Sequence, residues 1–172
     1  MKIYTKFGDD GMTQTLAGKT VSKNNCVIKV NGDIDSLQSN IDKMIMFIGE
    51  LPEGRHLQHI QTKLWQLGGE ISGEQVKNYV KDPITSQDIK LLEQWIDSLM
   101  NDTNLTGFVR FSKPITIEAN ECRVRTRRLE RTLTEYLENQ KIRAIAYTFI
   151  NRLSDYFFAL SVFYETEAYL QN

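Results

Sequence analysis

Cysteine and histidine are scarce in this sequence of 172 residues, and each shortage excludes a class of protein. The two cysteines, Cys26 and Cys122, are too few for a disulfide framework, which favours a reducing compartment. The two histidines, His56 and His59, have no cysteine or second carboxylate pattern nearby to complete a zinc site. Neither cysteine has an evident histidine partner. We therefore expect neither a protein-bound metal nor covalent catalysis.

An excess of charge of one sign and long apolar runs are also missing. The formal net charge of −1 argues against a general nucleic-acid binder. No apolar run approaches the ~20 residues that a bilayer crossing needs. The N-terminus lacks the apolar core of a signal peptide. We expect a cytoplasmic protein with no nucleic-acid or membrane partner.

What the sequence does contain is helical periodicity, in a chain that is 41% hydrophobic and of a length that suits one domain over 1–172. Residues 1–32 are rich in Gly, Thr, Lys and Asn and are predicted to be mostly loop. Pro52, Pro83 and Pro114 lie in turn-like stretches between apolar blocks. With almost no strand signal, the pattern predicts an all-α helical bundle. The expected helices cover 33–49, 55–72, 85–101, 118–140 and 142–169.

Two glycines interrupt the second expected helix. Gly68 and Gly69 would each cost roughly 1 kcal/mol relative to alanine there. We expect a close helix crossing to compensate. A bundle by itself indicates no function, so function must be argued from sites.

The segment from Tyr4 to Thr15 is the first candidate site. Gly8 and Gly11 permit tight turns, and Lys6 supplies a positive charge. Such a loop could surround a phosphate chain with backbone N–H groups. An ordinary surface turn explains the same residues and stays open.

The arginine-rich segment 123–131 is the second candidate. Arg123 and Arg127 stand one helical turn apart, and like charges at that spacing destabilise a helix by a few tenths of a kcal/mol. A bound anion or a carboxylate partner would offset this cost, and arginine binds phosphate in a bidentate manner. A solvated basic face is the equal alternative.

Polar residues beside apolar ones mark two further segments. Asp33 and Asp35 lie at the expected start of the first helix, where capping is the stronger interpretation. The functional alternative makes Asp35 a partner for an arginine of another helix. In 150–159, Asn151 and Asp155 share a flank beside aromatic residues. A packing network is favoured there over a polar ligand site.

Taken in order, these segments resemble the PduO-type ATP:cob(I)alamin adenosyltransferases. The family opens with T-x-T-G-D-x-G-x-T and then has a lysine before an Asn/Asp-rich turn. In this sequence the matching residues are Thr5, Gly8, Asp9, Gly11, Thr13 and Lys23. The family motifs Y-G-x-x-D-E-L-N-S, L-F-x-L-G-x-x-L-A, R-x-x-x-R-R-A-E-R and L-N-R-L-S-D-x-x-F follow. They match 31–39, 64–72, 123–131 and 150–158.

The resemblance implies a five-helix bundle with ferritin-like up-down packing and an N-terminal nucleotide-binding loop. It also implies a homotrimer with active sites between subunits. The implied reaction transfers the 5′-deoxyadenosyl group of ATP to the cobalt of reduced cobalamin or a related corrinoid and releases triphosphate, with Mg²⁺ as a bridging cation.

The same resemblance assigns roles to individual residues. Asp35 would pair with Arg123, Phe108 would cover the lower face of cobalamin, and the aromatic residues of 150–159 would face the corrin. The implied catalytic residues are Asp35, Phe108, Arg123 and Arg127. The implied ATP-binding residues are Thr5, Lys6, Gly8, Asp9, Gly11, Thr13, Lys23, Arg127, Arg128, Glu130, Arg131 and Asn151.

Several positions depart from the family pattern. Asp10 replaces a common lysine, Asn31 replaces a tyrosine, and Asn25-Cys26-Val27 replaces D-P-R. Residues 108–114 replace the aromatic-x-L-P-G-G turn. These departures leave an alternative open, a diverged relative that binds a corrinoid or a nucleotide without turnover.

Overall fold

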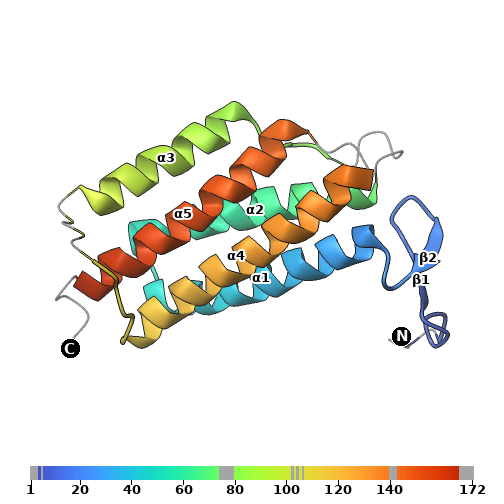
Figure 1. The fold of residues 1–172 in the computed structure, drawn as a ribbon, viewed down its shortest axis with the longest axis horizontal. Coiled ribbons are helices and arrows are strands. Elements are labelled where there is room, and N and C mark those ends of the chain that lie inside the picture. Colours follow the sequence, from blue (N-terminus) through green and yellow to red (C-terminus); the bar gives the residue numbers. More distant parts are fainter. Residues whose placement is uncertain are drawn as a thin grey trace.

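The computed structural model describes residues 4, 6–73, 80–101, 103, 105, 107–139 and 143–166. This part of the chain contains five helices and one small hairpin, which confirms the predicted all-α bundle (Figure 1). Successive helices run in opposite directions along the bundle. The elements are β1 (Met12–Gln14), β2 (Thr20–Ser22), α1 (Cys26–Ile48), α2 (Pro52–Ser72), α3 (Ser86–Met100), α4 (Pro114–Asn139) and α5 (Ala144–Thr166).

The core lies where the apolar faces of the helices meet. Helix α1 packs against α2 and α4, and α5 packs against α4 and α3. The apolar residues that gave the helical spacing are largely buried, which confirms the predicted core faces. Fully buried examples from α1, α2, α4 and α5 are Leu37, Ile41, Leu57, Leu64, Leu129, Leu133, Leu153 and Phe157. In the described part of the chain, no helix combines the length and apolar character needed to cross a membrane.

Two of the prolines begin helices instead of lying in the turns before them. Pro52 is the first residue of α2 and Pro114 is the first residue of α4, three and four residues before the predicted starts. Proline is suited to this position because the first N–H groups of a helix have no partner within the helix. Its missing donor therefore costs nothing there.

The prediction that residues 1–32 are mostly loop is wrong for the hairpin and for the first turns of α1. The side chain of Asn25 accepts a hydrogen bond from the backbone N–H of Val27 (3.0 Å) and caps α1 at its start. Strands β1 and β2 pair antiparallel, with Thr13 opposite Val21. Each strand has three residues, too few for an alternating pattern to be recognised.

The expected close crossing occurs at Gly68, between α1 and α2. A Cβ atom at Gly68 would lie 3.0 Å from Oδ1 of Asn31. The amide of Asn31 donates to Oγ of Ser72 (2.7 Å) and to the carbonyl of Val27 (2.8 Å). A larger residue at Gly68 would therefore displace the side chain that links the two helices.

Candidate functional site

The loop before the hairpin is a series of tight turns closed by a lysine. The Asp9 N–H donates to the Lys6 carbonyl and the Gly11 N–H donates to the Gly8 carbonyl, both at 3.3 Å. Lys6 and Gly11 have positive φ, at 61° and 82°. Lys23 Nζ donates to the Gly8 carbonyl (2.7 Å), and a Cβ atom at Gly8 would lie 3.0 Å from that nitrogen. The structure thus brings Lys6, Gly8, Gly11 and Lys23 together.

This loop projects from one end of the bundle (Figure 1). The Ala17 N–H donates to the Ser72 carbonyl (3.3 Å), which links the hairpin to the end of α2. Phe7 in the loop is half exposed. Thr5, a predicted ATP ligand, lies outside the described residues. The loop is therefore accessible from solvent for a ligand or a neighbouring subunit.

Helix α4 carries a strongly basic groove of about 420 Å³. Arg127 is 53% exposed, and its Nη1 lies 4.0 Å from Oε2 of Glu130. Arg123 Nε donates to Oδ1 of Asn120 (2.8 Å). Five arginines and one glutamate line this groove, and although Arg125 pairs with Glu121 and Arg128 with Asp33, the excess of positive charge suits it to a polyanion. The lining residues are Glu121, Arg123, Val124, Arg125, Arg127, Arg128 and Arg131.

One carboxylate and one amide connect the groove to α5. The Asn151 amide donates to Oε1 of Glu130 (2.7 Å), while the other oxygen of Glu130 faces Arg127. Three predicted ATP ligands, Arg127, Glu130 and Asn151, are therefore neighbours. Asn151 is exposed, so its side-chain oxygen is accessible to a ligand.

Arg128 follows Arg127 in sequence, but its guanidinium pairs with a residue of α1 instead of α5. Its Nε is 2.8 Å from Oδ1 of Asp33, and Thr132 Oγ1 donates to the other oxygen of Asp33 (2.6 Å). Asp33 is buried, so this pair joins α4 to α1. Asp33 lies in the second turn of α1, which begins at Cys26, so the capping interpretation of Asp33 and Asp35 is wrong.

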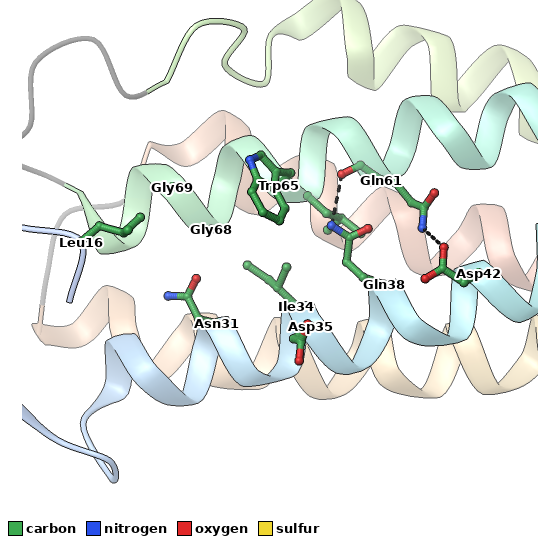
Figure 2. A pocket seen from close by; sticks show the side chains of 11 residues that line it. Leu16, Asn31, Ile34, Asp35, Gln38, Asp42, Gln61, Trp65, Gly68 and Gly69 are labelled. Atoms are coloured by element: carbon green, nitrogen blue, oxygen red, sulfur yellow. Dashed lines mark hydrogen bonds between the residues drawn. The ribbon is translucent and has the colours of Figure 1, made fainter. Parts of the chain in front are cut away.

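A second cavity, of about 540 Å³, opens between α1 and α2 (Figure 2). Asp35 and Gln38 line it from α1, while Gln61 and Trp65 line it from α2. The Trp65 side chain is 67% exposed. Within the residues that the structure describes, no hydrogen bond or ion pair joins Asp35 to Arg123. The expected pair therefore does not form within one subunit.

The aromatic residues of α5 are mostly core. Tyr156 and Phe157 are fully buried, so the expectation that this group faces a corrin is wrong for them. They fill the space between helices, which is the commonest use of large apolar side chains. Phe158 is 37% exposed and contacts Phe111 edge to face, with ring centroids 6.3 Å apart. Phe108, in contrast, is 99% exposed on the segment before α4.

That segment is held by a carboxylate that the sequence analysis missed. Glu165, near the end of α5, accepts hydrogen bonds from the Ser112 N–H (3.0 Å), the Ser112 hydroxyl and the Thr116 hydroxyl (2.6 Å). Burial is the largest single effect and raises the pKa of Glu165, but the hydrogen bonds together outweigh it and lower the pKa to about 2. No local sequence pattern indicates this cluster, because Ser112 and Glu165 are 53 residues apart in sequence.

The remaining titratable candidates serve packing. Burial raises the pKa of the Cys122 thiol to about 12, which leaves it un-ionised at neutral pH. His56 stacks on Trp95 (3.9 Å between centroids), and burial lowers its pKa. His59 Nε2 lies 2.9 Å from Asp88. Among the described residues, no cluster of three His, Cys, Asp or Glu side chains could hold a metal ion.

Comparison with known proteins gives one consistent result. The family model described as cobalamin adenosyltransferase matches residues 3–164. A corrinoid adenosyltransferase of Citrobacter freundii is 32% identical over 168 residues, covering 96% of both chains. A cobalamin adenosyltransferase of Cupriavidus metallidurans is 34% identical over 169 residues, covering 93% of this chain and 86% of that one.

A solved structure agrees with these sequence matches. It is a phenylalanine-to-alanine variant of the PduO-type ATP:corrinoid adenosyltransferase of Lactobacillus reuteri, complexed with cobalamin and ATP. It superposes with a TM-score of 0.86 at 26% identity and covers 95% of this chain and 93% of the other. The family model's match over 3–164 spans the hairpin and the helices that carry the two cavities.

Proposed function

Because this chain belongs to the cobalamin adenosyltransferase family, we propose that its N-terminal loop and its α4 groove form one ATP site, contributed by two neighbouring subunits. The chain is an ATP:corrinoid adenosyltransferase. The observation that carries the proposed site is the groove of five arginines beside Glu130 and Asn151, since it fits the most highly charged part of ATP.

The reaction needs positioning more than it needs acid–base chemistry. The cobalt(I) of the reduced corrinoid supplies an electron pair to C5′ of ATP and becomes cobalt(III). The C5′–O bond breaks and triphosphate leaves with its electron pair. No protein nucleophile takes part, which agrees with the un-ionised Cys122. The side chains contribute orientation and stabilisation of the charge on the leaving group.

Charged residues from both segments would hold the triphosphate. Arg127 and Lys23 provide the two principal cations, with Lys6, Arg128 and Arg131 nearby in their own segments. The turns at Gly8, Asp9 and Gly11, together with Thr13 of β1, would present backbone and hydroxyl groups to the ligand. Glu130 would orient Arg127 and Asn151, because it contacts both. Asn151 would then offer its side-chain oxygen to the nucleoside.

Mg²⁺ would accompany the triphosphate as a bridging cation. The loop fits a hard cation because Asp9 and Asp10 supply exposed carboxylate oxygens, the ligands that Mg²⁺ prefers. Bound by Asp9 and Asp10, Mg²⁺ would neutralise part of the negative charge of the phosphates. Mg²⁺ would come to the site with ATP.

Two separate faces support a homotrimer. Asp35 lines the α1–α2 cavity, and Arg123 lines the α4 groove. A head-to-tail contact that pairs these faces closes into a ring when the rotation between neighbours fits, and three subunits would give three equivalent sites. Asp35 would meet the partner's Arg123, and exposed Trp65 would be covered.

Phe108 would contact the corrinoid. Phe108 is 99% exposed, so placing its ring against an apolar ligand would remove apolar surface from water. Placed against the lower face of the corrin, the ring would exclude water and a lower axial ligand from cobalt. A four-coordinate cobalt(II) would then be easier to reduce.

We place the reaction in the reducing cytoplasm. Cys26 and Cys122 are both free thiols, as expected for that compartment.

The second candidate function, binding without turnover, rests on Asp10 and on the altered 108–114 turn. Anaerobic incubation with reduced cobalamin and ATP separates the two. An enzyme gives the adenosylcobalamin spectrum and one triphosphate per turnover, whereas a binder gives saturable binding with no product.

The charge at Asp10 gives a further prediction about the loop. Its Oδ1 accepts a hydrogen bond from the Met12 N–H (3.1 Å), and the side chain is exposed. Asp10→Lys replaces a repulsive charge near the triphosphate by an attractive one. Without Mg²⁺, we expect ATP to bind roughly three- to tenfold more tightly, measured by calorimetric titration.

Asp10→Asn is the matched control, since its side-chain oxygen can accept the same hydrogen bond without the charge. Its ATP affinity should lie between those of the other two proteins. Weaker binding of Asp10→Lys only when Mg²⁺ is present would assign the carboxylate to the metal instead. Equal affinities for all three proteins would place Asp10 outside the site.

A further inference from the structure

The segment 107–113 presents Phe108 to solvent and leads directly into α4. In the part of the chain that the structure describes, Phe108 is 99% exposed, so its position depends on how the backbone of the segment is held. Residues 109–113 contain neither proline nor glycine, so no turn-forming residue fixes the backbone directly after Phe108. Some other restraint must therefore define its course.

Glu165 supplies such a restraint from the last turn of α5. One carboxylate accepts from the Ser112 N–H, the Ser112 hydroxyl and the Thr116 hydroxyl. Hydrogen bonds to an ionised acceptor are about twice as strong as neutral ones. The carboxylate therefore fixes both the backbone at Ser112, four residues after Phe108, and the first turn of α4.

Lys113 makes the reciprocal connection. Its Nζ donates to the carbonyls of Tyr164 and Glu165, both at 2.8 Å. These carbonyls lie at the end of α5, where backbone acceptors lack partners within the helix and where positive charge is favourable. Glu165 and Lys113 thus join the two segments in both directions. We call this set of four residues, Ser112, Lys113, Thr116 and Glu165, the Glu165 clamp.

The clamp is remote from the nucleotide loop. The end of α5 and the start of α4 lie at one end of the bundle, and the N-terminal hairpin lies at the other (Figure 1). On α4, Arg127 lies 11 residues beyond Thr116, about three helical turns from the clamp. We therefore expect a change at Glu165 to alter the segment that carries Phe108 more than the phosphate-binding groups.

We propose that Glu165 is a positioning residue for adenosyl transfer, which holds Phe108 against the corrinoid through Ser112 and Lys113. The proposal rests on the proposed role of Phe108. Weakening it lets Phe108 move away from the lower face of cobalt, so that water or another axial ligand enters.

Glu165→Gln tests this with little change in shape. The amide keeps an acceptor oxygen but loses the charge and turns one acceptor into a donor, which faces donors at Ser112 and Thr116. We expect kcat to fall about tenfold, because a small misplacement of a positioning group is costly, while KM for ATP stays within about twofold. With cob(II)alamin and ATP bound, the absorbance spectrum should show a smaller fraction of four-coordinate cobalt.

Ser112→Ala provides a milder variant that keeps the backbone donor. It should reduce the four-coordinate fraction in the same direction by a smaller amount. Asp97→Asn is the matched control, a carboxylate-to-amide change at an exposed position on α3. Its kcat and its cobalt spectrum should equal those of the wild type, and circular dichroism should show the same helix content in all four proteins.

Three results would overturn the proposal. One is a Glu165→Gln protein whose kcat and spectrum match those of Asp97→Asn. Another is a Glu165→Gln protein with a lower kcat but an unchanged cobalt spectrum. The third is a KM for ATP that rises as kcat falls. Both of these would indicate a general loosening of the protein instead of a displaced Phe108. Failure of the wild type to form adenosylcobalamin would contradict the proposed function itself, whereas wild-type turnover with an unaffected Glu165→Gln contradicts the clamp alone.

Discussion

Arg127→Ala should lose most of its adenosyl-transfer activity and keep a folded bundle. In the proposed site this guanidinium stabilises the triphosphate as it leaves. A charge-assisted contact to phosphate contributes about 1.5–3 kcal/mol, which corresponds to a fall of roughly 10- to 150-fold in kcat/KM. The fold should survive because Arg127 is 53% exposed and its contact with Glu130 is long, at 4.0 Å. Steady-state kinetics and thermal unfolding measure the two effects.

Two other arginines serve as comparisons. Arg55→Ala changes an exposed arginine on α2, away from both cavities, and should alter neither rate nor stability. Arg128→Ala leaves buried Asp33 with Thr132 as its remaining partner, so the free energy of unfolding should fall by about 1–3 kcal/mol. An Arg127→Ala protein with unaltered rate and ATP affinity would contradict its assignment.

Asp35→Arg should dissociate the trimer and thereby abolish activity. If Asp35 meets the partner's Arg123, the substitution places two guanidinium groups in contact at an interface. Like charges juxtaposed there cost several kcal/mol. Sedimentation velocity at micromolar concentration should show a trimer for the wild type and smaller species for the variant. Activity should fall with the trimer fraction.

Exchange of the two charges makes this test specific. Arg123→Asp alone should fail in the same way, while Asp35→Arg combined with Arg123→Asp should recover the trimer. Asp97→Arg introduces the same charge on exposed α3 and should remain trimeric. A wild-type protein that is monomeric and fully active would contradict the shared site, as would an Asp35→Arg protein that stays trimeric.

Much of the bundle could be predicted because the evidence for a helix is local. Leu57, Leu64 and their neighbours in α2 repeat at the helical period, and they are buried as predicted. The helix starts were less accurate, because proline marks either a turn or the first residue of a helix. Pro52 and Pro114 take the second role. The hairpin was missed because its strands have three residues each.

The candidate site depended on information that spacing does not carry. Asp33 and Asp35 are two residues apart, so they point to different sides of α1. Asp33 pairs with Arg128 of α4, whereas Asp35 lines the α1–α2 cavity. The sequence alone could not decide which of the two aspartates pairs with an arginine of the same subunit. The Glu165 clamp was equally hidden, because a contact between distant segments leaves no periodic pattern.

Subunit mixing tests the central claim, that each adenosyl-transfer site combines the loop of one subunit with the α4 groove of its neighbour. Lys23→Ala damages the loop and Arg127→Ala damages the groove, so each protein alone should be nearly inactive. Every mixed trimer of the two would contain one site with an intact Lys23 and an intact Arg127. Random assembly from equal amounts should therefore recover about one quarter of the wild-type rate of adenosylcobalamin formation. A mixed sample no more active than its two parents would contradict the claim.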